Sequence, residues 1–130
     1  MVGILLITHA NLGDVLIECV SHVLNTRPAQ LLAFGVSPTD DPHDLVADAA
    51  VQVASLDTGR GVLVLTDLFG ASPANLALRV LVPGRVEAVA GVNLPMLLRV
   101  LTYREQLPLA GVVERAITGA CDGVLRMKPV

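Results

Sequence analysis

The chain has 130 residues, of which 53% are hydrophobic and 16% charged, and its net charge is −3. This length and composition suit a single folded domain and exclude a disordered chain. The acidic balance argues against a nucleic-acid-binding surface, which needs clustered Lys and Arg. An aromatic content of only 2% disfavours a site in which bases or flavins stack.

The first residues enter an apolar run at once, with neither a basic segment nor the small-residue cleavage site of a signal peptide. No apolar stretch approaches the roughly 20 residues that a membrane span needs. The two cysteines, Cys19 and Cys121, lie far apart and lack the spacing of a metal site. We therefore expect a cytoplasmic protein with no metal ion.

The first half of the chain alternates between strand and helix patterns. Residues 2–8 form an unbroken apolar run, which is typical of a strand buried on both faces. Helical spacing of apolar residues follows it, and residues 31–36 predict a second strand. In "TDDPHDLV", Asp41 is a predicted N-cap with Pro42 at the first helical position.

The second half repeats the alternation. "GVLVLTD" (61–67) predicts a third strand, after which Ser72 is the expected N-cap of a helix with Pro73 at its start. "VEAVAGV" predicts a fourth strand, and Asn93 opens the fourth helix. A fifth helix is expected over about 108–120, and residues 124–128 are a candidate for one further strand.

This order predicts one α/β domain over residues 1–130, with a doubly wound, mainly parallel sheet and helices on both faces. Right-handed crossovers favour the flavodoxin-like strand order 2-1-3-4. In that order, strands 1 and 3 are neighbours, and ligands bind at the carboxyl ends of the strands where the winding reverses.

Two polar residues, His9 and Asp67, end those two strands. Neighbouring strands lie about 4.8 Å apart, so the two side chains can share a hydrogen bond. The carboxylate would hold one ring N–H and leave the other ring nitrogen as a nucleophile. Helix starts near Leu12 and Ser72, together with the flexible Gly70, favour a phosphate beside them. A lone histidine after a strand is more often only a hydrogen-bonded polar residue with no reactive role. The expected pairing with Asp67 favours a reactive role for His9 instead.

Several other chemistries lack their motifs. Neither GxGxxG nor GxxxxGK[ST] occurs, which removes the dinucleotide and nucleoside-triphosphate fingerprints. A GxSxG nucleophile elbow and zinc-ligand spacing are also absent. We therefore expect no cofactor.

Three blocks together resemble the IIA component of the mannose family of the bacterial phosphotransferase system: "GILLITHANLGDVLIECV", "VLVLTDLFGASPANLAL" and "VAGVNLPMLL". The resemblance implies that His9 is phosphorylated by the phosphocarrier HPr and passes the phosphoryl group to a IIB protein. It assigns Asp67 as the partner of the histidine and Ser72 as a donor to the phosphoryl oxygens. "GVLRMKPV" resembles the last strand of the family, which implies a homodimer that exchanges this strand.

Both partner proteins are expected to dock around His9, on a rim of apolar residues formed by Leu12, Phe69, Leu94 and Met96. Gly70 and Asn93 are also expected to bind the phosphoryl group or the partners. Where the family often has Trp-Gly-Gly before the serine, this chain has Phe69-Gly70-Ala71.

Many members continue into a IIB domain, whereas this sequence stops at Val130. That leaves open a separate IIB acceptor, or a regulatory module that binds partners according to the phosphorylation state of His9. A small-molecule-binding domain of the same fold is a third reading. Sugar specificity is not expected in this chain, because in the family the membrane components select the sugar.

Overall fold

The central strands are short runs of apolar, mostly branched residues that helices cover on both sides. The computed structural model describes residues 1–130 and pairs these strands in parallel, in the order β2-β1-β3-β4. This is the predicted flavodoxin-like order, with β1 between β2 and β3. The strands are β1 (Gly3–His9), β2 (Leu31–Val36), β3 (Val62–Thr66) and β4 (Val86–Ala90).

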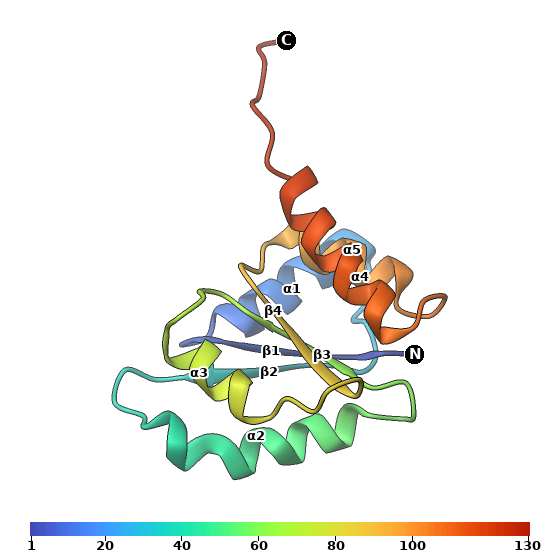
Figure 1. Cartoon of the computed structure of the whole chain (residues 1–130). Helices are drawn as coiled ribbons and strands as arrows, with labels where there is room; N and C mark the ends of the chain where they lie inside the picture. The colour runs from blue at the N-terminus through green and yellow to red at the C-terminus, as the bar shows by residue number, and fades with distance from the viewer.

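Helices form a layer on each face of the sheet (Figure 1). They are α1 (Leu12–Leu24), α2 (Pro42–Leu56), α3 (Ser72–Arg79), α4 (Leu94–Tyr103) and α5 (Leu109–Asp122). The helices α1, α4 and α5 cover one face, and α2 and α3 cover the other. None of them combines the length and hydropathy required of a membrane span.

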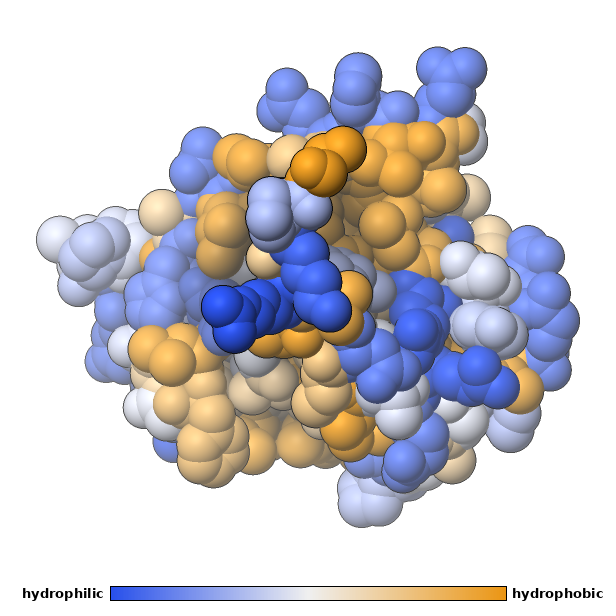
Figure 2. Space-filling model, turned by 90° about the horizontal axis from the view of Figure 1, so that it is seen from above, coloured by the Kyte–Doolittle hydropathy of each residue, from blue (hydrophilic) through white to orange (hydrophobic).

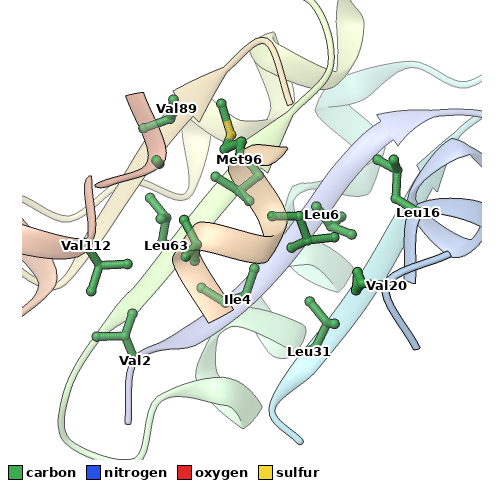
Figure 3. Packing of buried hydrophobic residues seen from close by; sticks show 14 of the residues in the cluster. Val2, Ile4, Leu6, Leu16, Val20, Leu31, Leu63, Val89, Met96 and Val112 are labelled. Carbon is green, nitrogen blue, oxygen red and sulfur yellow. The ribbon is translucent and has the colours of Figure 1, made fainter. Parts of the chain in front are cut away.

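Each face of the sheet has its own hydrophobic core. Alternate residues of β1 divide between them, because successive side chains of a strand point to opposite faces. Ile4 and Leu6 pack with α1, α4 and α5, and Leu5 and Ile7 pack with α2 and α3. Figure 3 shows the first of these cores, in which Leu6, Leu63 and other strand residues lie against helix side chains. Burial on both faces explains why these strands lack a polar alternation.

The helix starts agree with the predicted caps at two positions and differ at one. Asp41 accepts the N–H of His43, and Asn93 accepts the N–H of Met96, so both caps are confirmed. Ser72 was the expected N-cap of α3, but Ala71 holds that position and Ser72 is the first helical residue. Since Ala71 has an extended backbone and no polar side chain, α3 starts without a side-chain cap.

The last seven residues, 124–130, leave the end of α5 and project from the molecule (Figure 1). They form no strand in the single chain, so the strand expected over 124–128 is not seen here. Val124, Leu125 and Met127 are between 75% and 91% exposed. Viewed from above, apolar atoms also gather on the α1, α4 and α5 side around this tail (Figure 2). Exchange of the tail between two copies stays a prediction.

Candidate functional site

The carboxyl ends of the three neighbouring strands β2, β1 and β3 bring the site together. His9 is the last residue of β1 and pairs in register with Val36, the last residue of β2. On the other side, Ile7 pairs with Thr66, so that Asp67 follows directly beside the end of β1. The sheet therefore places His9 and Asp67 at the predicted point where the winding reverses.

Asp67 binds His9 through a single carboxylate oxygen. The Oδ2 atom of Asp67 lies 3.0 Å from the backbone nitrogen of His9, whose N–H it accepts. It lies 2.8 Å from the ring Nδ1 of the same residue. A carboxylate at this nitrogen favours the tautomer with the proton on Nδ1 and the lone pair on Nε2. The His9 side chain is 51% exposed, and no hydrogen bond within the chain occupies its second ring nitrogen.

The electrostatics of Asp67 favour its charged form. Burial by itself raises the pKa of this carboxyl, but the hydrogen bonds from the backbone and ring of His9 lower it more, and the pKa lies below its ordinary value of 3.8. The other oxygen, Oδ1, is buried and has no hydrogen-bond partner. A carboxylate that is ionised at neutral pH stabilises a positive charge on the neighbouring imidazole.

The backbone behind His9 is held by β2. Ala10 has a left-handed φ of 47°, which is uncommon for a residue with a side chain. Its N–H donates to the carbonyl of Val36 at 2.9 Å, and its own carbonyl lies where a Cβ on Gly35 would be. Gly35 is thus required by a contact with a residue 25 positions earlier. No local pattern in the sequence marks such a contact, so neither Ala10 nor Gly35 is predictable as a site residue from the sequence alone.

The loop between β3 and α3, together with the first residue of α3, presents three of the predicted residues at the surface. Phe69 is 82% exposed, and Gly70 has a φ of 86°, which favours glycine. Ser72 is exposed, and its hydroxyl makes no hydrogen bond in the structure. Because this hydroxyl does not cap α3, it is available to a ligand.

The residues expected beyond this loop divide between the surface and the core. Leu12 is 39% exposed and Leu94 is half-buried against the first core. Both polar groups of Asn93 are used internally, since its amide also donates to the carbonyl of Ala120 at 3.3 Å. Met96 is only 1% exposed and points into the core in Figure 3, so its side chain does not line a docking rim as expected. The physical reason is helical spacing, which turns the second residue after Leu94 towards the sheet.

No group of three or more His, Cys, Asp or Glu side chains in the chain is arranged to hold a metal ion. The site is a histidine–carboxylate pair at the carboxyl ends of β1 and β3, followed by the exposed loop that leads to the free hydroxyl of Ser72. Such a pair can act as a nucleophile and can carry a transferred group on the imidazole.

A family model described as "PTS system fructose IIA component" matches residues 3–117. The chain belongs to the IIA components of the mannose and fructose type of the sugar phosphotransferase system. A mannose-specific EIIAB component of Escherichia coli is 39% identical over 97 residues, which are 72% of this chain and 30% of that protein. The chain thus aligns with about a third of the length of this curated relative.

Solved structures agree with the assignment of this IIA chain. A phosphotransferase component EIIA of Streptococcus agalactiae superposes with a TM-score of 0.85 over 97% of each chain, at 20% identity, which shows the shared fold. A IIA protein associated with the fucose utilization operon of Streptococcus pneumoniae has a TM-score of 0.75 and 29% identity, covering 89% of this chain and 88% of that one. The resemblance predicted from the three sequence blocks is confirmed.

Proposed function

We propose that His9 accepts a phosphoryl group from phosphorylated HPr and passes it to a IIB component. The observation that carries this proposal is the bond between His9 Nδ1 and Asp67 Oδ2, which leaves Nε2 as the exposed nucleophile. Membership of the IIA family supports the same reaction.

In the first step, the lone pair of His9 Nε2 attacks the phosphorus atom of the phosphohistidine on HPr. The new N–P bond forms as the donor N–P bond breaks, and the electron pair of that bond returns to the donor imidazole. The His9 ring gains positive charge during attack, and the neighbouring carboxylate of Asp67 stabilises it. Transfer to IIB reverses these roles, with His9 as the leaving group. Positioning and charge stabilisation supply most of the catalysis in phosphoryl transfer.

The phosphoryl oxygens need donors that are not already used by the fold. The Ser72 hydroxyl and the backbone N–H of Ser72 make no hydrogen bond within the chain. They lie at the start of α3, whose dipole favours negative charge. The space beside Gly70 is open, since apart from its chain neighbours no atom lies within 4 Å of the place a Cβ would occupy. These groups would hold the phosphoryl oxygens in both transfer steps.

Donor and acceptor must reach the same nitrogen, so both proteins would dock in turn on one surface. Around His9 this surface contains three exposed apolar side chains, Leu12, Leu68 and Phe69, of which Phe69 is the most exposed. Large exposed apolar side chains beside a reactive group are typical of a protein-docking surface. Leu94 and the backbone of Asn93 would lie at its border.

Phosphorylation by HPr provides the direct test. The intact chain is incubated with phosphorylated HPr, and acid-labile phosphate is measured on the wild type and on the His9→Ala and His22→Ala variants. His22 is the matched control, because it is an exposed histidine on α1 that bonds to no other side chain. Labelling is expected in the wild type and in His22→Ala alone. Equal labelling of His9→Ala would overturn the assignment.

Onward transfer distinguishes the carrier from the regulatory module. A IIB protein added to the labelled chain is expected to take the phosphoryl group from His9 about as fast as His9 receives it from phosphorylated HPr. A phosphate that stays on His9 in the presence of cognate IIB would instead support a switch, in which the added charge beside Asp67 changes which partners bind.

We further propose that the chain acts as a homodimer in the cytoplasm, as expected from the resemblance. The exposed apolar residues of the tail, 124–130, support pairing between two copies, as does the outer edge of β4, where only an isolated bridge joins Val86 to Val82. An unpaired strand edge offers N–H and C=O groups to another chain.

A further inference from the structure

We propose that Thr8 is a positioning residue for phosphoryl transfer at His9, because its buried hydroxyl joins the end of β1 to the first turn of α1. The inference rests on the proposed function of His9. Thr8 is 0% exposed, and so it cannot contact a phosphoryl group or a docked protein. It would act only through the geometry of the neighbouring histidine.

The Thr8 hydroxyl forms two hydrogen bonds. Its Oγ1 atom accepts the N–H of Gly13 at 2.8 Å, and it donates to the carbonyl of His9 at 3.3 Å. One side chain therefore binds both the backbone of the reactive residue and the helix that follows it. Leaving the buried N–H of Gly13 without an acceptor would cost free energy, so this hydrogen bond restricts the positions of both Thr8 and Gly13.

Thr8 takes the place of the ordinary helix cap. Asn11 occupies the N-cap position of α1, but its backbone is not in the usual cap conformation and its side chain caps nothing. Asparagine is among the residue types that most often cap a helix N-terminus with their side chain. The cap is instead supplied from the strand, five residues before Gly13.

The close packing of α1 makes this bond sensitive to position. A Cβ on Gly13 would lie 3.0 Å from the Ala33 side chain and 3.2 Å from that of Leu6. The helix backbone thus lies directly on the sheet, so that a small shift of its first turn would be passed on to the end of β1. Loss of the Thr8 hydroxyl would let this turn shift and would move the main chain of His9, with its ring, relative to Asp67.

The neighbouring strand contains a matched control. Thr66, at the end of β3, is 2% exposed, and its hydroxyl has no hydrogen-bond partner. Thr8→Val and Thr66→Val remove the same atom from the same residue type at the same edge of the sheet. Only the first removes hydrogen bonds.

The test compares Thr8→Val, Thr8→Ser and Thr66→Val with the wild type in the full chain. For transfer from phosphorylated HPr, Thr8→Val is expected to lower kcat about 10-fold with KM within about twofold, since a small misplacement of the reactive group acts on the chemical step. Thr8→Ser keeps the hydroxyl and is expected to restore kcat. Thr66→Val is expected to match the wild type.

The NMR signals of the His9 imidazole nitrogens give a second readout that needs no phosphoryl donor. Thr8→Val is expected to change the Nδ1–H signal that reports the bond to Asp67, and Thr66→Val to leave it unchanged. Identical imidazole signals in Thr8→Val and Thr66→Val would overturn the positioning role, even if Thr8→Val is less stable. If the wild type takes no phosphate from HPr, the proposed function is wrong. The imidazole signals would still show whether Thr8 positions the His9 ring.

Discussion

The Oδ2 atom of Asp67 meets both the backbone nitrogen and the ring Nδ1 of His9, at 3.0 Å and 2.8 Å. One carboxylate oxygen therefore fixes the main chain and the ring of the same histidine. This double contact joins the ends of β1 and β3 and orients the imidazole without covering its second nitrogen.

We predict that Asp67→Asn slows phosphoryl transfer without unfolding the protein. The amide oxygen can accept the same two hydrogen bonds, so the geometry is kept while the negative charge is lost. Loss of charge stabilisation is expected to reduce the transfer rate on the order of 10-fold to 100-fold. Rapid-quench transfer from phosphorylated HPr measures the rate, and circular dichroism checks the fold. A rate within twofold of the wild type would show that the charge is not used.

A substitution at Gly35 is predicted to affect His9 from the neighbouring strand. In Gly35→Ala, the added methyl group meets the carbonyl of Ala10, so the backbone next to His9 must shift. We expect the free energy of unfolding to fall by about 1–3 kcal/mol, as in overpacked sites. Transfer at His9 is expected to slow as well. Urea unfolding and phosphate labelling measure the two effects.

Gly111→Ala is the control for that substitution. Gly111 lies in α5, and the nearest atoms to an added methyl group would be those of the Leu107 side chain, at 3.2 Å and beyond. Its labelling rate should equal that of the wild type. If Gly35→Ala also keeps the full rate, the contact with Ala10 does not position the site.

The acid sensitivity of the fold is predicted to depend on Asp57. Its carboxylate accepts the N–H groups of Gly59 and Gly61, and Arg85 pairs with it. The bond from Gly59 is the main cause that lowers the pKa of Asp57 below 3.8, and burial opposes it. Because the folded pKa is depressed, this stabilisation is present above the unfolded pKa and is lost as the pH falls through the folded pKa.

Asp57→Asn should therefore lower the Tm at pH 7 and flatten the loss of stability below about pH 4. Thermal unfolding between pH 2.5 and pH 7 measures both. Asp48→Asn is the control, since Asp48 is exposed on α2 and its side chain makes no hydrogen bond. The same acid slope in Asp57→Asn as in the wild type would contradict the prediction.

Removal of the tail tests the proposed dimer. A chain that ends at Gly123 lacks the exposed tail, 124–130, with its apolar residues Val124, Leu125 and Met127, but keeps α5 and both cores. We expect the wild type to elute as a dimer on a sizing column and the shortened chain to shift towards monomer. If the two chains elute at the same apparent mass, the tail does not hold two copies together.

The strand and helix order was predictable because each element depends on local patterns. The apolar run of β1 and the caps at Asp41 and Asn93 agree with the structure. Two other positions show where local patterns fail. Ser72 has the chemistry of a cap but lies one residue inside α3, and Met96 has the chemistry of a rim residue but faces the core. A shift of one residue along a helix changes the direction of a side chain by about 100°, which sequence alone does not resolve.

The sequence by itself determined the alternation of strands and helices, the parallel sheet and the pairing of His9 with Asp67. Buried apolar runs and right-handed crossovers leave few other arrangements. Only the tertiary structure decided how His9 is held: by one oxygen of Asp67, by the left-handed turn at Ala10 against Gly35, and by the buried hydroxyl of Thr8, which bonds to the His9 carbonyl and to the N–H of Gly13. The contacts of Asp67 and Gly35 join residues that are distant in the chain, and the Thr8 hydroxyl is buried. The geometry of all three arises only when the strands and α1 pack together.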